Sequence, residues 1–109
     1  MDSADQAKRD IVCVQMYDLQ KRFDMFKLHN EVYPDTEEGF SALLSNPDPD
    51  KYPNYPVKPY LKKMPKDSWK TPFIYINRGS EIELISFASD KKEGGDENDQ
   101  DILFSHCNK

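Results

Sequence analysis

The residue types best suited to chemistry gather near the C-terminus, between Ser86 and Asp101. Six carboxylates stand there against two lysines, so this stretch carries −4 of the net charge of −5: Asp90, Glu93, Asp96, Glu97, Asp99 and Asp101. Gly94 and Gly95 lie among them and allow backbone carbonyls to turn inward. Calcium accepts many oxygen ligands in flexible geometry, so the segment could bind Ca²⁺. The spacing is not that of an EF-hand, and from these residues alone a solvated, mobile acidic loop is favoured over a metal site.

Catalytic patterns are weak elsewhere in the chain. The only histidines are His29 and His106, and the only cysteines are Cys13 and Cys107. A Cys–His pair is one option, and a disulfide between the two cysteines or two unrelated thiols are the others. No serine lies in a nucleophile-elbow pattern, and no glycine-rich loop is suited to phosphate. We therefore expect no enzyme.

Length and composition exclude several classes of protein. The 109 residues suit one domain, 1–109, and the acidic balance argues against nucleic acid as a partner. There is no apolar run of the length a membrane span needs and no signal-like segment, so the chain as given is expected to be soluble. It enters a helical pattern almost at once, as the second half of a longer helix would.

A long amphipathic helix is predicted from about Ala4 to Asn30. Apolar residues recur there at alternating steps of four and three, and the helix would be about 40 Å long. We expect Asn30 to adopt the left-handed conformation of a C-terminal cap before Pro34. The rest of the chain must cover the apolar seam, which consists of Val12, Met16, Leu19, Phe23 and Phe26.

A short second helix is predicted to follow, capped by Asp35 or Thr36. Asp35 and Glu38 have the spacing of a capping box. The expected apolar face consists of Phe40, Leu43 and Leu44. Gly39 would lie inside this helix, which suggests close packing against another backbone.

Residues 46–72 contain seven of the eight prolines, interleaved with Tyr52, Tyr55, Tyr60 and Trp69. We expect an ordered, extended loop whose rings pack on the core. A polyproline ligand for an SH3-like partner is the alternative.

Three strands are predicted after this loop. Residues 73–76 and 82–87 would form a hairpin around a turn at 77–80, and 102–104 would add a third strand. The order of helix, helix, loop and strands indicates an α+β fold with an antiparallel sheet laid against the long helix.

Three stretches together resemble one family. The run from Phe26 through Leu43 is similar to the "YKLDNGRYPTTEQGLxAL" pattern of the major pseudopilins, the G subunits of type II secretion systems. The run from Tyr60 to Phe73 is similar to "YLKKLPKDPWGNPY", and Ser86 through Ile102 follows "SxGADGxxGGxGENADI" in outline. The resemblance covers nearly the whole chain in the right order.

The resemblance implies a truncated pilin-like fold and a role in building a filament. Members of the family are periplasmic domains of proteins anchored in the bacterial inner membrane. Their leader and anchoring helix half would precede Ser3. They assemble with copies of themselves, with other pseudopilins and with inner-membrane secretion components. Their acidic loop binds Ca²⁺, which by position implies side-chain ligands at Asp90 and at Asp96 or Glu97. The carbonyls of Phe87, Lys92 and Gly95 would complete the set.

The sequence departs from the pattern at several glycines. "GADG" reads Ala88-Ser89-Asp90-Lys91, and Glu31 replaces the glycine after the long helix. The two cysteines are not part of the pattern, and in a periplasmic protein they favour a Cys13–Cys107 disulfide. Alternatives are a minor pseudopilin, a type IV pilin, or a secreted Ca²⁺-dependent binding module.

Overall fold

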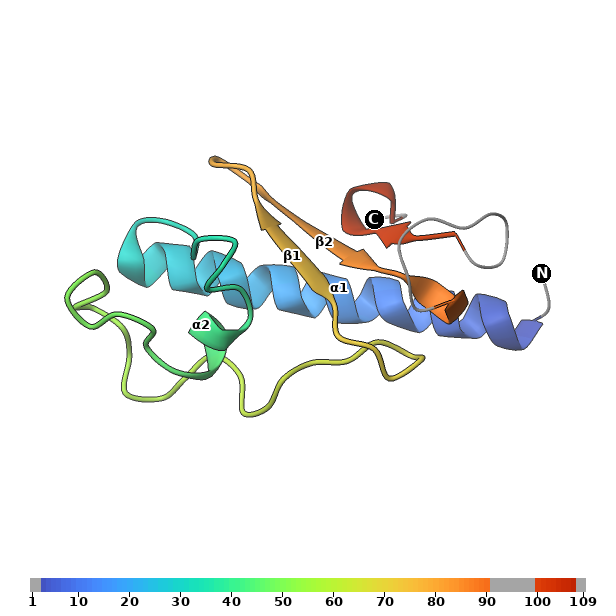
Figure 1. Ribbon diagram of the computed structural model, residues 1–109, viewed down its shortest axis with the longest axis horizontal. Helices are drawn as coiled ribbons and strands as arrows, with labels where there is room; N and C mark the ends of the chain where they lie inside the picture. The colour runs from blue at the N-terminus through green and yellow to red at the C-terminus, as the bar shows by residue number, and fades with distance from the viewer. Residues whose placement is uncertain (1–2, 91–99, 108–109) are drawn as a thin grey trace.

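The long helix α1 (Ser3–Asn30) runs along the molecule, whose extents are 47 × 25 × 24 Å (Figure 1). The computed structural model describes residues 3–90 and 100–107. Besides α1 these residues form α2 (Ser41–Leu44), β1 (Ile74–Asn77), β2 (Ile82–Ser86) and β3 (Ile102–Leu103). Two 3₁₀ turns are also present: η1 (Ala88–Asp90) lies in the first part of the acidic segment, and η2 (Phe104–His106) follows β3. The predicted α+β architecture is confirmed.

The predicted apolar seam of α1 is the centre of the core. Its members are each at most 3% exposed: Val12, Met16, Leu19, Phe23 and Phe26. The steps of four and three keep them on one helical face, and no Pro or Gly interrupts the helix. Phe23 stacks on Tyr75 of β1 with ring centroids 4.4 Å apart, and it also contacts Phe40. The prediction for this helix and its core residues is confirmed.

The end of α1 differs by one residue from the expectation. Asn30 is the last helical residue, and the left-handed residue is Glu31, with φ of 72°. The Glu31 N–H donates to the Lys27 carbonyl at 2.7 Å, which satisfies one carbonyl of the last helical turn. The chain therefore adopts a left-handed backbone at a residue that has a Cβ, which is an unfavourable conformation.

The second helix is shorter than predicted. It begins at Ser41 and not at Asp35 or Thr36, because Gly39 has φ of 50° and interrupts helical geometry. The Glu38 side chain still accepts a hydrogen bond from the Asp35 N–H at 2.8 Å, so half of the predicted capping box closes a turn. A Cβ at Gly39 would make only an ordinary contact with the Thr36 carbonyl. Glycine is therefore favoured at this position by the positive φ and not by close packing.

The apolar face of this short helix also differs in one member. Phe40 and Leu43 are buried as expected, but Leu44 is only half-buried and Ala42 is buried in its place. The four-residue helix is too short to keep residues 40, 43 and 44 on one continuous stripe.

The proline-rich segment is ordered, as predicted, and its tyrosines cover one end of α1. Tyr52 and Tyr60 lie with ring centroids 5.0 and 5.6 Å from that of Phe26. Each phenol finds a partner: the Tyr55 hydroxyl donates to the Ala42 carbonyl at 2.8 Å, and the Tyr52 hydroxyl donates to Glu38. Burial, reinforced by the Glu38 carboxylate, raises the pKa of Tyr52 to about 12.

The sheet has the order β1-β2-β3 and is antiparallel throughout. The predicted hairpin is confirmed, with β1 one residue later and β2 one residue shorter than expected. Phe104 was expected in the third strand but begins η2. The cause is the buried Glu83 carboxylate, which accepts hydrogen bonds from the Ser105 N–H and hydroxyl and turns the chain back over β2.

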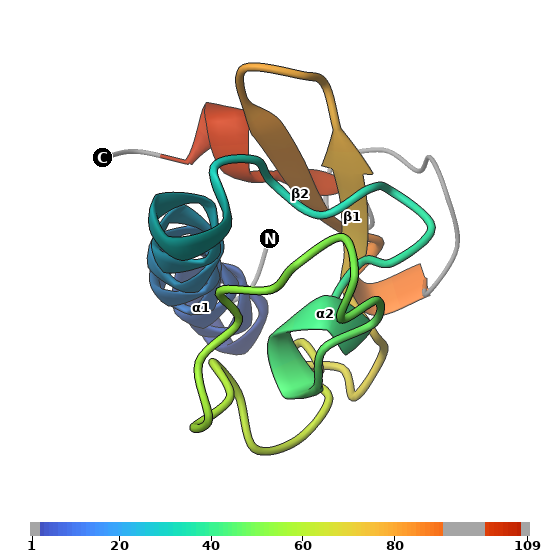
Figure 2. The same cartoon turned by 90° about the vertical axis from the view of Figure 1, so that its left-hand side faces the viewer.

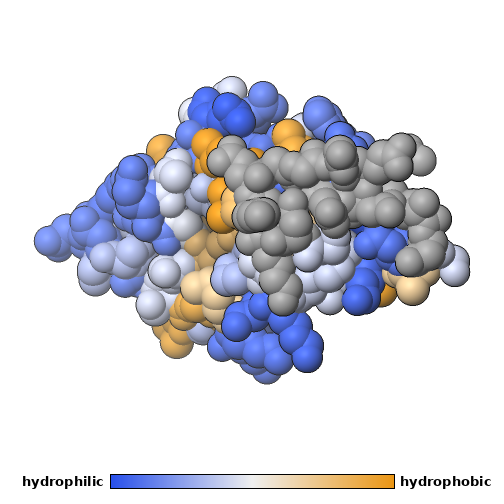
Figure 3. Space-filling model, turned by 45° about the vertical axis from the view of Figure 1, so that its right-hand side comes forward, coloured by the Kyte–Doolittle hydropathy of each residue, from blue (hydrophilic) through white to orange (hydrophobic). Residues whose placement is uncertain are grey.

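The described elements lie on one side of α1, with the sheet above and the proline-rich segment below it in the end-on view (Figure 2). On the face shown in Figure 3, hydrophilic residues cover the left-hand end, and a narrow band of hydrophobic residues lies beside them. Among the described residues no helix combines the length and apolarity of a membrane span.

The left-handed backbone at Glu31 yields a test. Glu31→Gly is expected to raise the free energy of unfolding by about 1 kcal/mol, because glycine has no Cβ to strain in this conformation. Chemical denaturation of both proteins measures the difference. Glu31→Ala is the control: it removes the same carboxylate but keeps the Cβ, so it should give no such gain. An equal gain from both variants would assign the effect to charge.

Candidate metal centre

The sheet brings together the two ends of the acidic segment. β2 leads into it and β3 leads out of it, and Ser86 is the register partner of Ile102. Residues 86 and 102 therefore lie side by side although fifteen residues separate them in sequence. Any ligands in the segment belong to a loop whose base is already closed by backbone pairing.

A buried carboxylate fastens that base to the proline-rich segment. The Ser86 hydroxyl donates to Asp67 Oδ2 at 2.7 Å, and the Ala88 N–H donates to the Ser86 oxygen at 3.1 Å. Asp67 Oδ1 accepts from the N–H groups of Trp69 and Thr71 at 2.9 and 3.0 Å. Asp67 is only 5% exposed, so these bonds replace the water it loses. Sequence reasoning missed this residue, although it lies in the "PKD" part of the family pattern.

Three residues explain how the fold tolerates the missing glycines. Glu31, Lys70 and Ala88 have φ of 72°, 65° and 62°, and they are the non-glycine residues with positive φ among those described. Each stands where the pseudopilin pattern has glycine, after "DN", after "PW" and at the start of "GADG". The backbone keeps the geometry that glycine permits while the side chains differ. The backbone at Ala88 therefore has a conformation that glycine readily adopts.

The structure covers only part of the predicted ligand set. Phe87 lies half-buried between β2 and η1, and Asp90 is the last residue of η1. Lys92, Gly95, Asp96 and Glu97 lie outside the described residues. Within 3–90 and 100–107, no three Asp, Glu, His or Cys side chains form a group that could hold a metal ion. The oxygen-rich composition and the closed base fit a hard cation, and the calcium site stays a prediction.

The cysteines form a disulfide. Cys13 in α1 and Cys107 after η2 are bonded, with their Cα atoms 5.8 Å apart. The bond joins the C-terminal segment to the long helix and leaves neither thiol available as a nucleophile beside His106. The other histidine, His29, is hydrogen-bonded through Nδ1 to the Tyr60 hydroxyl, with 2.8 Å between the two atoms.

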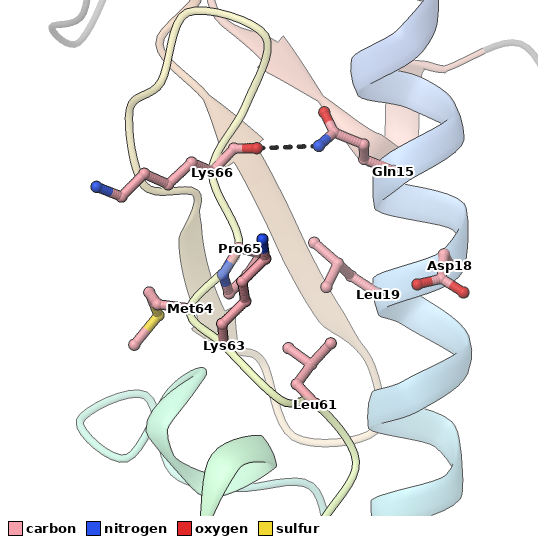
Figure 4. Close-up of a pocket in the computed structure, with 8 residues that line it drawn as sticks. All are labelled: Gln15, Asp18, Leu19, Leu61, Lys63, Met64, Pro65 and Lys66. Carbon is pink, nitrogen blue, oxygen red and sulfur yellow. Dashed lines mark hydrogen bonds between the residues drawn. The ribbon is translucent and has the colours of Figure 1, made fainter.

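A groove of about 530 Å³ lies between α1 and residues 61–66 (Figure 4). The apolar residues that line it are Leu19, Leu61, Met64 and Pro65, and Gln15 donates to the Lys66 carbonyl at 2.9 Å across one end. Asp18 and Lys63 are its other polar residues. No serine, cysteine or histidine lines it, so this groove offers no nucleophile with an adjacent base.

Comparison with known proteins decides the family. A sequence model described as "Type II secretion system (T2SS), protein G" matches residues 1–105. The chain belongs to the type II secretion system protein G family. It is 38% identical over 105 residues to a type II secretion system core protein G of Pseudomonas aeruginosa, an alignment covering 94% of this chain and 74% of the relative.

Two further relatives agree with this membership in the protein G family. The core protein G of Vibrio cholerae is 36% identical over 105 residues, covering 93% of this chain and 68% of the relative. Among solved structures, the major pseudopilin of enterohaemorrhagic Escherichia coli superposes with a TM-score of 0.77 at 29% identity. That match covers 92% of this chain and 88% of the other. The protein G fold of a long helix packed on a small antiparallel sheet is thereby established for this chain.

The disulfide gives a prediction for stability. Reduction, or the double variant Cys13→Ser/Cys107→Ser, is expected to lower the free energy of unfolding by about 4–5 kcal/mol. The bond closes a loop over a sequence separation of 94 residues and so restricts the unfolded chain. Guanidinium denaturation with and without reductant measures the change. The double variant should not respond to reductant, and an unchanged midpoint for the reduced native sequence would contradict the prediction.

Proposed function

We propose that this chain is the building block of a type II secretion pseudopilus, a periplasmic filament that drives protein export. The observation that carries the proposal is the family match over residues 1–105 together with the pseudopilin fold. Both favour a major subunit over a minor pseudopilin, a type IV pilin or a free-standing binding module. The chain would assemble with its own copies, with other pseudopilins and with inner-membrane secretion components. It would be the periplasmic domain of an inner-membrane-anchored protein.

The shape of the chain suits this role. A filament subunit must transmit axial force without bending, and α1 is an uninterrupted helix of 28 residues along the longest dimension. The disulfide ties the C-terminal segment to that helix, and Asp67 ties the base of the acidic loop to the proline-rich segment. The C-terminal segment is thus fixed directly to α1, and the base of the acidic loop is fixed to the proline-rich segment that packs on α1.

The proposal includes a Ca²⁺ ion in the loop after β2. The ion would be held by side-chain oxygens at Asp90 and at Asp96 or Glu97, with carbonyls of Phe87, Lys92 and Gly95. Its chemistry there is structural: it would neutralise neighbouring carboxylates and hold the sheet edge in shape for packing between subunits. What supports it is the oxygen-rich composition, the closed base of the loop and the left-handed backbone at Ala88.

Calcium should stabilise the folded chain. Binding to the native state alone adds about 2.7 kcal/mol at a hundredfold excess over Kd, so the melting temperature should rise with Ca²⁺ and fall with chelator. Asp90→Ala should abolish this shift. Asp50→Ala, which removes an exposed acid of the proline-rich segment, is the matched control and should leave the shift intact. A native chain that melts at the same temperature in both conditions contradicts the calcium proposal.

The role in secretion is tested in the source bacterium. Deleting the gene is expected to stop release of the type II substrates into the medium, and the wild-type gene should restore it. Overproduction of the full-length protein should yield filaments visible by electron microscopy and labelled by an antibody to this domain. Normal secretion in the deletion strain would overturn the proposed function.

A further inference from the structure

Two hollows lie in a row between α1 and the proline-rich segment. The first is the groove of about 530 Å³ beside residues 61–66, and the second, of about 360 Å³, is lined by residues 58–62. The two hollows adjoin, because Leu61 lines both, and their lining on α1 extends from Gln15 to Arg22. Together they form an elongated trough, a shape that suits an extended polypeptide segment.

The floor of this trough is apolar and only partly covered. Leu19 points from α1 toward residues 61–66 (Figure 4), and Met64 is 40% exposed. Leu61 and Pro65 are half-buried. Apolar side chains of a partner that lie on this floor would remove its remaining apolar surface from water, which favours binding.

The rim of the trough is basic. Lys63 and Lys66 line the first hollow, and Lys58 and Lys62 line the second. All four are exposed, and none forms an ion pair with another residue that the structure describes. They carry +4 in a chain whose net charge is −5, so the remaining residues together carry −9. Positive charge is thus concentrated at the trough, where it attracts acidic groups.

The composition of the trough specifies its occupant. Ammonium groups on the rim pair with carboxylates, and an apolar floor requires apolar side chains, so the occupant offers both. The acidic lining residue Asp18 does not oppose this, because Arg22 pairs with its carboxylate at 2.8 Å. An anionic lipid surface is flat and would meet the lysines without filling the hollows between them and α1.

A second copy of this chain is a poor match for the trough. Its most acidic stretch is 90–101, and that stretch contains no apolar residue other than glycine. Ile102, which follows it, is buried in the core. The stretch could neutralise the lysines, but it would leave the apolar floor in contact with water. The two halves of the trough together therefore favour a segment of a different protein.

We propose that the trough between α1 and residues 58–66 is a docking site for an extended, acidic segment of a different protein that carries apolar side chains. Alternate residues of an extended segment point to the same side, so apolar residues two apart would lie on the floor at Leu61 and Met64. Acidic residues around them would pair with the lysines of the rim. The inference goes beyond the proposed function, because it assigns a partner that is not a copy of this chain.

A pair of synthetic peptides tests the recognition chemistry. Fluorescein-labelled EDLELDED has two leucines two residues apart among six acids, and EDSESDED is the control with the same charge and no apolar side chain. Fluorescence anisotropy measures the binding of each to the 109-residue chain. The leucine peptide is expected to bind about tenfold or more tightly than the serine peptide, and to weaken with added salt. Equal binding of the two peptides would overturn the proposal.

Two variants locate the binding on the chain. Lys63→Glu should weaken binding of the leucine peptide about threefold or more, because it replaces an attraction by a repulsion. Arg78→Glu is the matched control: it makes the same charge change at an exposed residue in the hairpin turn between β1 and β2, and it should leave binding unchanged. Both variants should melt at the temperature of the parent chain. An equal loss of binding in both would assign it to net charge and overturn the proposal.

The apolar floor is tested in the same assay. Met64→Gln should weaken binding of the leucine peptide to near that of the serine peptide, because an amide replaces the apolar surface at nearly constant size. Leu28→Gln is the control, since Leu28 is 71% exposed on α1 and does not line the trough. Vesicles of phosphatidylglycerol should not displace the peptide. Displacement by the vesicles would assign the trough to a membrane surface and overturn the proposal.

Photo-cross-linking tests the site in the cell. p-Benzoylphenylalanine in place of Met64 of the full-length protein should give, on irradiation of the source bacterium, an adduct with a different protein. Mass spectrometry of the cross-linked peptide should find acidic residues beside apolar ones, and Lys63→Glu should reduce the adduct. The same group in place of Leu28 is the control and should not capture that peptide. A peptide of this chain itself at position 64, or no adduct there, would overturn the proposal.

These results are distinguishable from failure of the proposed function. A trough that binds no acidic segment leaves the role in secretion intact, because that role is tested by export in the deletion strain. Normal export in that strain would overturn the proposed function and would leave peptide binding by the trough unaffected.

Discussion

The fold depends on covering one apolar face of a helix too long to be stable alone in water. A seam from Val12 to Phe26 requires a partner surface along most of its length, and no single element among residues 3–90 and 100–107 is long enough to provide it. The sheet covers the middle, and the tyrosines of the proline-rich segment cover the C-terminal end. This requirement explains why an irregular segment is as ordered as the strands: its rings are core residues.

The C-terminal part of the chain is held by three interactions of different kinds. Backbone pairing joins Ser86 to Ile102, the Asp67 carboxylate binds the base of the acidic segment, and a disulfide links Cys107 to α1. The proposed calcium loop lies between these points. An ion bound there would therefore shape a loop whose ends are already fixed, and the rest of the domain would not depend on it to fold. One side of α1 is left uncovered by the described elements in the same arrangement.

The sequence predicts what is repetitive and local in this structure. The seam of α1, the hairpin and the core tyrosines follow from spacing and residue type, and the disulfide and family follow from the resemblance. The start of α2 was placed wrongly because one backbone angle at Gly39 outweighs a capping pattern. Asp67 was missed because its burial depends on donors at residues 69, 71 and 86, which only the tertiary fold assembles. The left-handed residues Glu31 and Ala88 were visible only as departures from a glycine pattern.

Native-state hydrogen exchange of the isolated domain tests most directly whether burial of the α1 seam holds the fold together. Amides between residues 12 and 26 are expected to exchange only through global unfolding, with the same free energy and the same denaturant dependence as amides of β2. Exchange of those helical amides at a much lower free energy, while β2 stays protected, would contradict the account. It would show that sheet and loop are stable without the helix they cover.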